Sequence, residues 1–328
     1  MLKVANNKPV LEAVDRPIGE PVVQNRDNFE SYSMWRGSSF DRLAQRRIFA
    51  DRSWIDAQPG LVAQGRAICM FDAQETAPEY LVELIDRFYR VFVFVAPGAK
   101  AEWMRKVSRA GHRTYPYVVL VGREANLEHC RTLVREEEPR LREASIVHLA
   151  DHAEPGHLRQ VQELHTRTNM FPQPQYFVEG CDSAVLTSLL LDEDGIAIGT
   201  TMYHHLVRAG PAFRFTACGL NSAIRPRRTH SVRRAAERTR SLSLAAWLDA
   251  AAILRCHEQF GMREVWSYPR ADNRRAIAFH YELGARESKD VCCFCAEHRA
   301  ALPDRRHTGN ATALSAAHRA ETPSTAGL

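Results

Sequence analysis

Short apolar runs alternate with amphipathic segments of helix length over residues 59–150. The apolar runs cover 66–71, 91–95, 117–121 and 145–149, and the segments between them cover 77–89, 100–110 and 126–142. Such runs are typical of buried strands, and segments with a 3.6-residue period are typical of helices that cover a sheet. The pattern predicts a smaller α/β domain with a mainly parallel sheet, in which helices connect successive strands.

The pattern changes after a polar Pro/Gly joint at 151–156. Two strand-like runs flank the turn at 192–195, so they predict an antiparallel hairpin, and a third strand is predicted at 212–220. The elements predicted after it are a helix at 244–260, a strand at 264–268, a helix at 273–283 and a strand at 290–295. The second predicted domain therefore covers 152–297.

The two ends of the chain have no such pattern. An irregular N-terminal lead-in with one short helix at 39–49 is predicted for 1–58, because prolines recur there and the hydrophobic periodicity is weak. Residues 298–328 are poor in large apolar side chains, so a disordered tail is predicted.

Composition narrows the class of protein. A chain of 328 residues with 45% apolar and 25% charged residues is globular in composition and long enough for two domains. The formal charge of +5, from 44 basic and 39 acidic residues, is too small to indicate a nucleic-acid-binding protein. Nearly all the basic residues are arginine, and seven of them lie between positions 225 and 240, so this segment is expected to meet a planar oxyanion such as phosphate.

The cysteines and the apolar stretches indicate a cytoplasmic protein. The eight cysteines show no pairs at zinc-ligand spacing and are interpreted as reduced thiols, with the cluster at 292–295 packed in a strand. No apolar stretch approaches the roughly 20 residues that cross a bilayer, so no membrane partner is expected. The adjacent His204 and His205 face opposite sides of a strand, and no metal site is predicted.

The segment 271–284 carries the most specific pattern of the second half. The aspartate or asparagine at its start can cap a helix, Ala276 and Phe279 share one helix face, and Gly284 can end the helix in a left-handed conformation. With the order of strands and helices around it, this segment resembles the GNAT superfamily of acyl-CoA-dependent N-acyltransferases. The resemblance implies a mixed, mostly antiparallel sheet flanked by helices, whose central strands part to admit the pantetheine arm of acetyl-CoA or another acyl-CoA.

A second segment occupies the place of the GNAT phosphate loop. Arg238 matches the Arg or Gln that opens that loop, and Ser241 and Ser243 stand where the superfamily has small residues. The predicted start of the next helix at Leu244 would supply backbone N–H groups and partial positive charge for the coenzyme A pyrophosphate. The candidate cofactor-binding residues are Arg238, Thr239, Arg240, Ser241, Leu242, Ser243 and Asn273.

The candidate catalytic residues are His280 and Tyr281. The resemblance implies a general acid at the position of His280, where the superfamily usually has a tyrosine, and Tyr281 comes one residue later. One residue turns a helix by about 100°, so both side chains cannot face one thioester. His280 is the expected acid, because its reference pKa of about 6.5 suits proton exchange near neutral pH. The predicted third strand has no carboxylate that could act as the general base, and Cys218 and Asn221 are the polar groups available there.

Two interpretations of the first half stay open. The segment 164–171 resembles the start of the acyltransferase-like half of FkbH-type proteins, which carry a HAD-like domain in front. Residues 69–76 are similar to the HAD strand end, but Gln74 stands in place of its second aspartate, so phosphatase chemistry is not expected. Alternatively, the strand, helix, glycine and strand at 91–121 repeat part of the second half, as in a degenerate GNAT copy.

The resemblance predicts an acyltransferase that moves an acetyl or other small acyl group from acyl-CoA to a small-molecule amine. One alternative is transfer to the phosphopantetheine thiol of an acyl carrier protein in natural-product biosynthesis. Another is a catalytically silent acyl-CoA-binding module.

Overall fold

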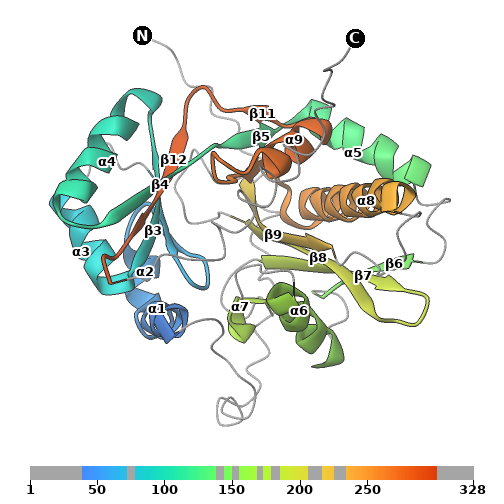
Figure 1. The fold of residues 1–328 in the computed structure, drawn as a ribbon, viewed down its shortest axis with the longest axis horizontal. Coiled ribbons are helices and arrows are strands. Elements are labelled where there is room, and N and C mark those ends of the chain that lie inside the picture. Colours follow the sequence, from blue (N-terminus) through green and yellow to red (C-terminus); the bar gives the residue numbers. More distant parts are fainter. Residues whose placement is uncertain are drawn as a thin grey trace, which may run out of the picture.

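The computed structural model describes residues 39–71, 78–137, 144–149, 155–167, 173–178, 185–205, 216–224 and 234–300, with the side chains of 205–243 left out. These residues form two sheets, of five and seven strands, each with helices against it (Figure 1). The fold class is α/β, as predicted, and the second sheet is mixed and flanked by helices, also as predicted.

The first sheet contains β1 (Leu61–Ala63), β2 (Ile68–Met70), β3 (Arg90–Val95), β12 (Cys292–Glu297) and β4 (Arg113–Tyr117), in that spatial order. Its outer face packs against α1 (Ser39–Ala50), α2 (Arg52–Ala57), α3 (Pro78–Phe88) and α4 (Lys100–Arg109), the last preceded by the 3-10 turn η3 (Pro97–Ala99). Phe88, Trp103 and Phe294 are among the side chains buried between this face and the helices.

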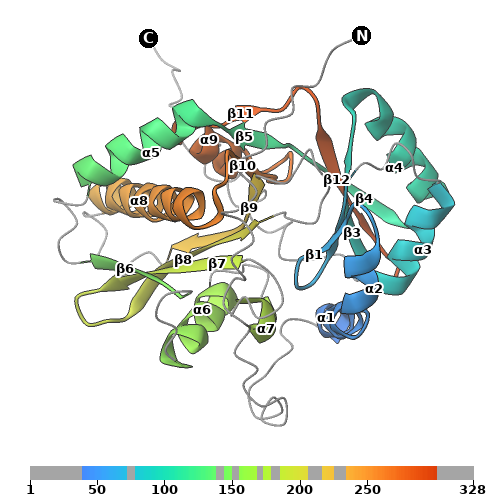
Figure 2. The same ribbon diagram turned by 180° about the vertical axis from the view of Figure 1, so that it is seen from behind.

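The second sheet contains β11 (Arg286–Glu287), β5 (Leu120–Gly122), β10 (Glu264–Ser267), β9 (Thr216–Ile224), β8 (Ala197–His205), β7 (Val185–Asp192) and β6 (Ala144–His148), in that order. The helices around it are α5 (Glu124–Glu137), α6 (Pro155–Arg167), α7 (Gln175–Val178), α8 (Arg234–Phe260) and α9 (Arg274–Glu282). Helices α5 and α8 cover one face, and α6 and α7 cover the other (Figure 2). Side chains of β7 alternate between the two faces, with Leu186 under α8 and Leu189 under α6.

The two halves exchange strands. Strand β5 of the first half lies between β10 and β11 of the second sheet, and β12 at the end of the second half lies between β3 and β4 of the first sheet. Each inserted strand is antiparallel to both of its neighbours. Beside each inserted strand is the one parallel pair that the described part of that sheet contains, β2 with β3 and β9 with β10. Both sheets therefore have a parallel pair beside an inserted antiparallel strand, and each sheet contains a strand from the other half of the chain.

This exchange corrects two sequence predictions. The first sheet is mixed and not mainly parallel, because β2 with β3 is the one parallel pair of neighbouring strands in the described part of this sheet. The boundary near residue 150 does not divide the sheets, since β5 and β6 belong to the second sheet and β12 to the first. The apolar run at 117–121 is also divided between two strands, because Tyr117 is the last residue of β4 and Leu120 is the first residue of β5. An apolar run indicates that a strand is buried, but it does not indicate which strand pairs with it or in which direction. The pattern of apolar and polar residues therefore could not predict the exchange.

The predicted helices are largely confirmed, and one of them starts earlier than predicted. Helix α8 begins at Arg234 and not at Leu244. Its first residues are mainly alanine, arginine and glutamate, which favour helix and outweigh the serines at 241 and 243. In α9, Asn273 caps the helix by accepting a hydrogen bond from the Ala276 N–H at 3.2 Å, and Gly284 ends it with φ of 88°.

Candidate active site

The parallel strands β9 and β10 part at the centre of the second sheet. Strand β10 pairs from Glu264 to Ser267 with residues 216 to 219 of β9 and then ends. Strand β9 continues to Ile224 on β8, and along 220–224 it has no strand partner on its β10 side in the described residues. The sheet therefore forks at the level of Ser267, as the resemblance to GNAT proteins implied.

A β-bulge lies at the same level on β9. Met202 of β8 is opposite Asn221, and Tyr203 is opposite Gly219, so Leu220 is the extra residue of β9. A bulge leaves backbone groups outside the ladder and turns the strand locally, and bulges are frequent beside active sites. The bulge and the end of β10 together open a backbone edge at the fork.

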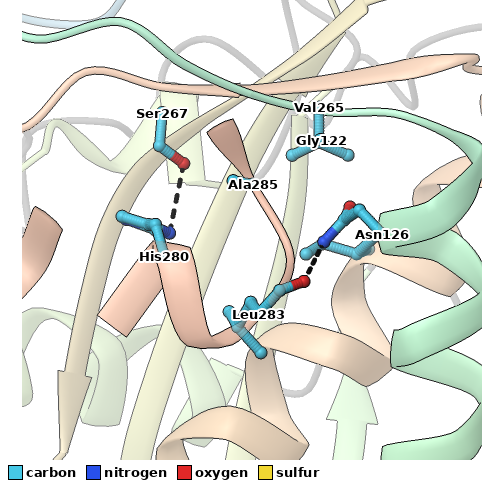
Figure 3. Close-up of a pocket in the computed structure, with 8 residues that line it drawn as sticks. Gly122, Asn126, Val265, Ser267, His280, Leu283 and Ala285 are labelled. Atoms are coloured by element: carbon cyan, nitrogen blue, oxygen red, sulfur yellow. Dashed lines mark hydrogen bonds between the residues drawn. The ribbon is translucent and has the colours of Figure 1, made fainter. Parts of the chain in front are cut away.

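His280 of α9 stands beside the fork. Its Nδ1 lies 3.4 Å from the Ser267 hydroxyl oxygen at the end of β10 (Figure 3). Both side chains line a small cavity of about 10 Å³, roughly the space that one water molecule needs. Its other lining residues are Gly122, Asn126, Ile253, Val265, Leu283 and Ala285. Asn126 donates its side-chain N–H to the Leu283 carbonyl on the far side of this cavity. The cavity thus joins α9 and β10 to the exchanged strand β5.

Burial controls the protonation of His280. Desolvation lowers the pKa of His280 to about 4, so the imidazole is neutral at pH 7. A neutral ring can donate one hydrogen bond and accept another, and Ser267 can occupy the Nδ1 side. The expected acid role then depends on a negative charge developing nearby, which would raise the pKa again.

The other residues predicted around α9 lie elsewhere. Tyr281 is 38% exposed and outside the cavity that His280 lines, which agrees with the different facing of neighbouring helix positions. Asn273 lies on the exposed start of α9, where its side-chain oxygen already caps the helix. Of the three residues, the structure brings only His280 to the fork.

The predicted phosphate segment lies inside a helix. Residues 238–243 belong to α8, so their backbone N–H groups point along the helix and not into a loop before it. Their side chains lie outside the described set. The unpaired N–H groups of a helix belong to its first turn, which here starts at Arg234. Four of the seven neighbouring arginines, at 225, 227, 228 and 233, are outside the described residues.

A set of buried polar side chains lies where the two halves meet. Gln64, at the turn between β1 and β2, accepts a hydrogen bond of 2.5 Å from the hydroxyl of Tyr268, which follows β10. Gly65 is packed so closely on Gln173 that a Cβ built on it would lie 2.3 Å from the amide oxygen. His165 of α6 is fully buried, and within the described part of the chain no hydrogen-bond partner is found for either of its ring nitrogens, for the Gln173 amide oxygen or for the Gln64 amide nitrogen. Buried polar atoms normally have partners, so this set could accommodate a polar ligand or water.

Sequence reasoning missed Ser267, Gln64 and His165. Ser267 stood inside a predicted strand, and nothing in the sequence indicates that this strand ends beside a parting neighbour. Cys218 and Asn221 lie on β9 with side chains outside the described set. The HAD-like positions at 72–76 are also outside the described residues, as are 168–171, the second half of the segment that resembles FkbH-type proteins. No described helix is long and apolar enough to cross a membrane.

No protein-family model and no curated protein matches the sequence. Solved structures similar to the chain include a tandem GNAT protein from the clavulanic acid biosynthesis pathway, with 11% identity, a TM-score of 0.41, and coverage of 72% of this chain and 76% of that chain. A GCN5-related N-acetyltransferase from Kribbella flavida has 14% identity and a TM-score of 0.43, covering 78% of this chain and 95% of that one. The C-terminal domain of a putative lysylphosphatidylglycerol synthetase from Agrobacterium fabrum has 10% identity and a TM-score of 0.42, with coverage of 84% and 96%.

Proposed function

We propose that the chain is an acyltransferase that moves an acetyl or other small acyl group from acyl-CoA to a small-molecule amine. The observation that carries the proposal is the fork between β9 and β10, with His280 and Ser267 at its base. The fork combines an open backbone edge with a neutral, half-buried histidine that lines a cavity.

The fork suits the extended arm of an acyl thioester. Pantetheine carries two amide groups, and an extended chain with amides can hydrogen bond to a free strand edge as an added strand does. The edge along 220–224 offers backbone donors and acceptors of this kind. The start of α8 at Arg234 and the arginine-rich segment before it would bind the phosphates at the other end of the cofactor.

The chemistry needs one proton to move. The amine nitrogen bonds to the acyl carbon, the carbon–sulfur bond breaks, and the proton lost by the amine ends on the thiol sulfur. With the Ser267 hydroxyl donating to Nδ1, the His280 proton lies on Nε2, from which it would stabilise the departing thiolate. The buried set of Gln64, His165 and Gln173 would contact the amine acceptor.

The proposal is tested by acetyl-CoA binding and by turnover with a panel of amines. We expect His280→Ala to lower kcat by roughly 100-fold, the usual worth of one proton-transfer group, with a smaller loss for Ser267→Ala. Tyr281→Phe is the matched control, because it changes the next residue on α9 outside the cavity.

Three outcomes would overturn the proposal. One is coenzyme A binding without transfer to any amine, which would favour a silent binding module. Another is transfer only to a phosphopantetheinylated carrier protein. A third is equal activity of the His280→Ala and Tyr281→Phe variants, which would move the site away from the fork.

A further inference from the structure

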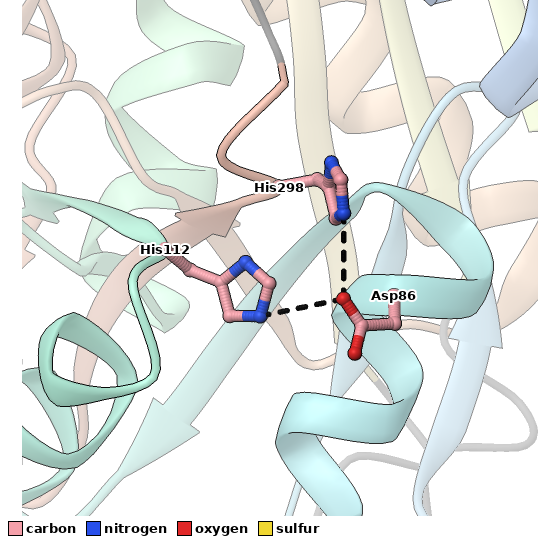
Figure 4. Close-up of side chains that lie close together, drawn as sticks. All are labelled: Asp86, His112 and His298. Atoms are coloured by element: carbon pink, nitrogen blue, oxygen red, sulfur yellow. Dashed lines mark ion pairs between the residues drawn. The ribbon is translucent and has the colours of Figure 1, made fainter.

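Three potential metal ligands meet in the first half of the molecule, away from the fork. Asp86 lies in the last turn of α3, His112 lies between α4 and β4, and His298 follows β12 directly (Figure 4). One Asp86 carboxylate oxygen lies 3.5 Å from Nε2 of His112 and 3.4 Å from Nε2 of His298. The ligand atoms of all three residues lie within 4.8 Å of one another.

These spacings do not match direct ion pairs as well as they match a shared cation. Hydrogen bonds between a charged donor and a carboxylate are usually about 2.7–2.9 Å long. A tetrahedral zinc ion with bonds of about 2.0–2.1 Å separates its ligand atoms by roughly 3.3–3.4 Å. Both nitrogen–oxygen distances lie close to this tetrahedral edge.

We propose that Asp86, His112 and His298 bind a divalent transition-metal ion of the zinc class, with solvent completing a tetrahedral site. Two imidazoles and a carboxylate are ligands that such ions accept. The site is open on one side, because the Asp86 side chain is 57% exposed whereas that of His112 is 3% exposed. The open side leaves room for the fourth ligand. The spacing of the three residues in the sequence hides the site, so no metal motif is visible there.

To bind a metal ion, each histidine must present an unprotonated ring nitrogen to it. Burial is the main cause that lowers the pKa of His112. Asp86 opposes this shift, and His298 and Arg299 add to it. The Nδ1 of His298 accepts the Ala300 N–H at 3.1 Å. Metal binding at Nε2 moves the ring proton to Nδ1, so this exposed hydrogen bond must open.

The ion would act as a clamp on the exchanged strand. His298 follows β12, which belongs in sequence to the second half, whereas Asp86 and His112 belong to the helices and turns of the first half. A bound ion would join the end of β12 to α3 and to the start of β4. This predicts a stabilising, structural ion and not one that takes part in acyl transfer.

The test uses the full-length chain after treatment with a chelator. Calorimetric titration with Zn²⁺ is expected to give one ion per chain, and Co²⁺ is expected to give the visible spectrum of a tetrahedral site without thiolate charge-transfer bands. The variants Asp86→Asn and His298→Gln should weaken Zn²⁺ binding at least tenfold. Glu83→Gln, an exposed carboxylate on the same helix, and His129→Gln, an exposed histidine on α5, are the matched controls.

Zn²⁺ should also raise the melting temperature of the wild type and of both controls, but not that of Asp86→Asn or His298→Gln. Circular dichroism checks that every variant is folded. Equal Zn²⁺ affinity in all five proteins, no binding by the wild type, or a cobalt spectrum with thiolate bands would overturn the site.

Discussion

His165 makes the stability of the protein depend on pH. Burial, followed by the nearby Arg66, lowers the pKa of His165 to about 4, below its value of about 6.5 in an unfolded chain. The unfolded state therefore binds more protons between these two pH values. The stabilisation from a neutral His165 is complete above pH 6.5 and is lost as the pH falls towards 4, by on the order of 1–2 kcal/mol at pH 5.

His165→Leu tests this residue directly. Leucine is similar in volume and does not titrate, so the variant should lose less stability than the wild type between pH 7.5 and pH 5, measured by urea unfolding. His280 shifts in the same direction and keeps part of the pH dependence in the variant. An identical loss in both proteins would show that His165 does not titrate below its usual range.

Single residues also show why the candidate site was only partly predictable. His280 could be selected because a helix motif fixes its position, and a period of about 100° per residue separates it from Tyr281. Ser267 meets His280 of α9, and Gln64 meets Tyr268 from 204 positions away in the sequence. Their proximity depends on strand pairing, for which the sequence pattern has no signal.

At the scale of an element, the start of α9 makes a quantitative prediction. Asn273→Ala removes the side-chain acceptor of the Ala276 N–H and should destabilise the protein by about 1 kcal/mol. The measurement is the midpoint of urea unfolding, with Asp272→Ala as the neighbouring control that leaves this cap bond in place. If Asn273→Ala weakened acetyl-CoA binding without changing stability, Asn273 would be a cofactor ligand and not a cap.

Helices were easier to predict than strands for a physical reason. The predicted helices at 77–89 and 100–110 match α3 and α4 within one residue, because helix periodicity, caps and stops are local. The start of α8 was wrong because two serines were interpreted as a loop, whereas the flanking helix formers extend the helix. The hairpin of β7 and β8 was predicted correctly, because a short turn joins its two strands. The partners of β5 and β12 were not predicted, because they lie more than 100 positions away in the sequence.

At the scale of the molecule, a buried ion cluster holds the exchanged strand in place. Arg90 of β3 donates to Glu297 of β12 at 2.7 Å and to Asp41 of α1 at 3.2 Å, and all three side chains are largely buried. Burial lowers the pKa of Arg90, but the carboxylates of Glu297 and Asp41 outweigh burial and raise it above its usual value. The arginine therefore stays charged, and removing a partner leaves that charge uncompensated.

Glu297→Gln should destabilise the whole protein by about 3 kcal/mol, because a buried charge pair is broken from one side. Urea unfolding measures the change. Glu287→Gln on β11 is the control, since Glu287 is exposed on the edge strand of the other sheet. A change of similar size in both variants would mean that the cluster does not stabilise the strand exchange.

The exchange also predicts that both halves unfold together. Trp54 and Trp103 report on the core of the first sheet and Trp247 on a core of the second, whereas Trp266 packs against Phe94 of the first sheet. Fluorescence of a variant with Trp35, Trp54, Trp103 and Trp266 changed to Phe reports on Trp247 and should give the same urea midpoint as its circular dichroism. The reciprocal variant should behave in the same way. Separate midpoints would show that each half unfolds independently.

The position of β12 has a consequence for the newborn chain. The ribosome releases residues 292–297 long after β3 and β4, between which they belong. Until then the edges of β3 and β4 that pair with β12 have no partner, and such unpaired strand edges can pair with other chains. The first half therefore cannot fold as a separate domain during translation. Its N-terminal half must wait for the last strand, so synthesis is the stage at which it is most exposed to aggregation.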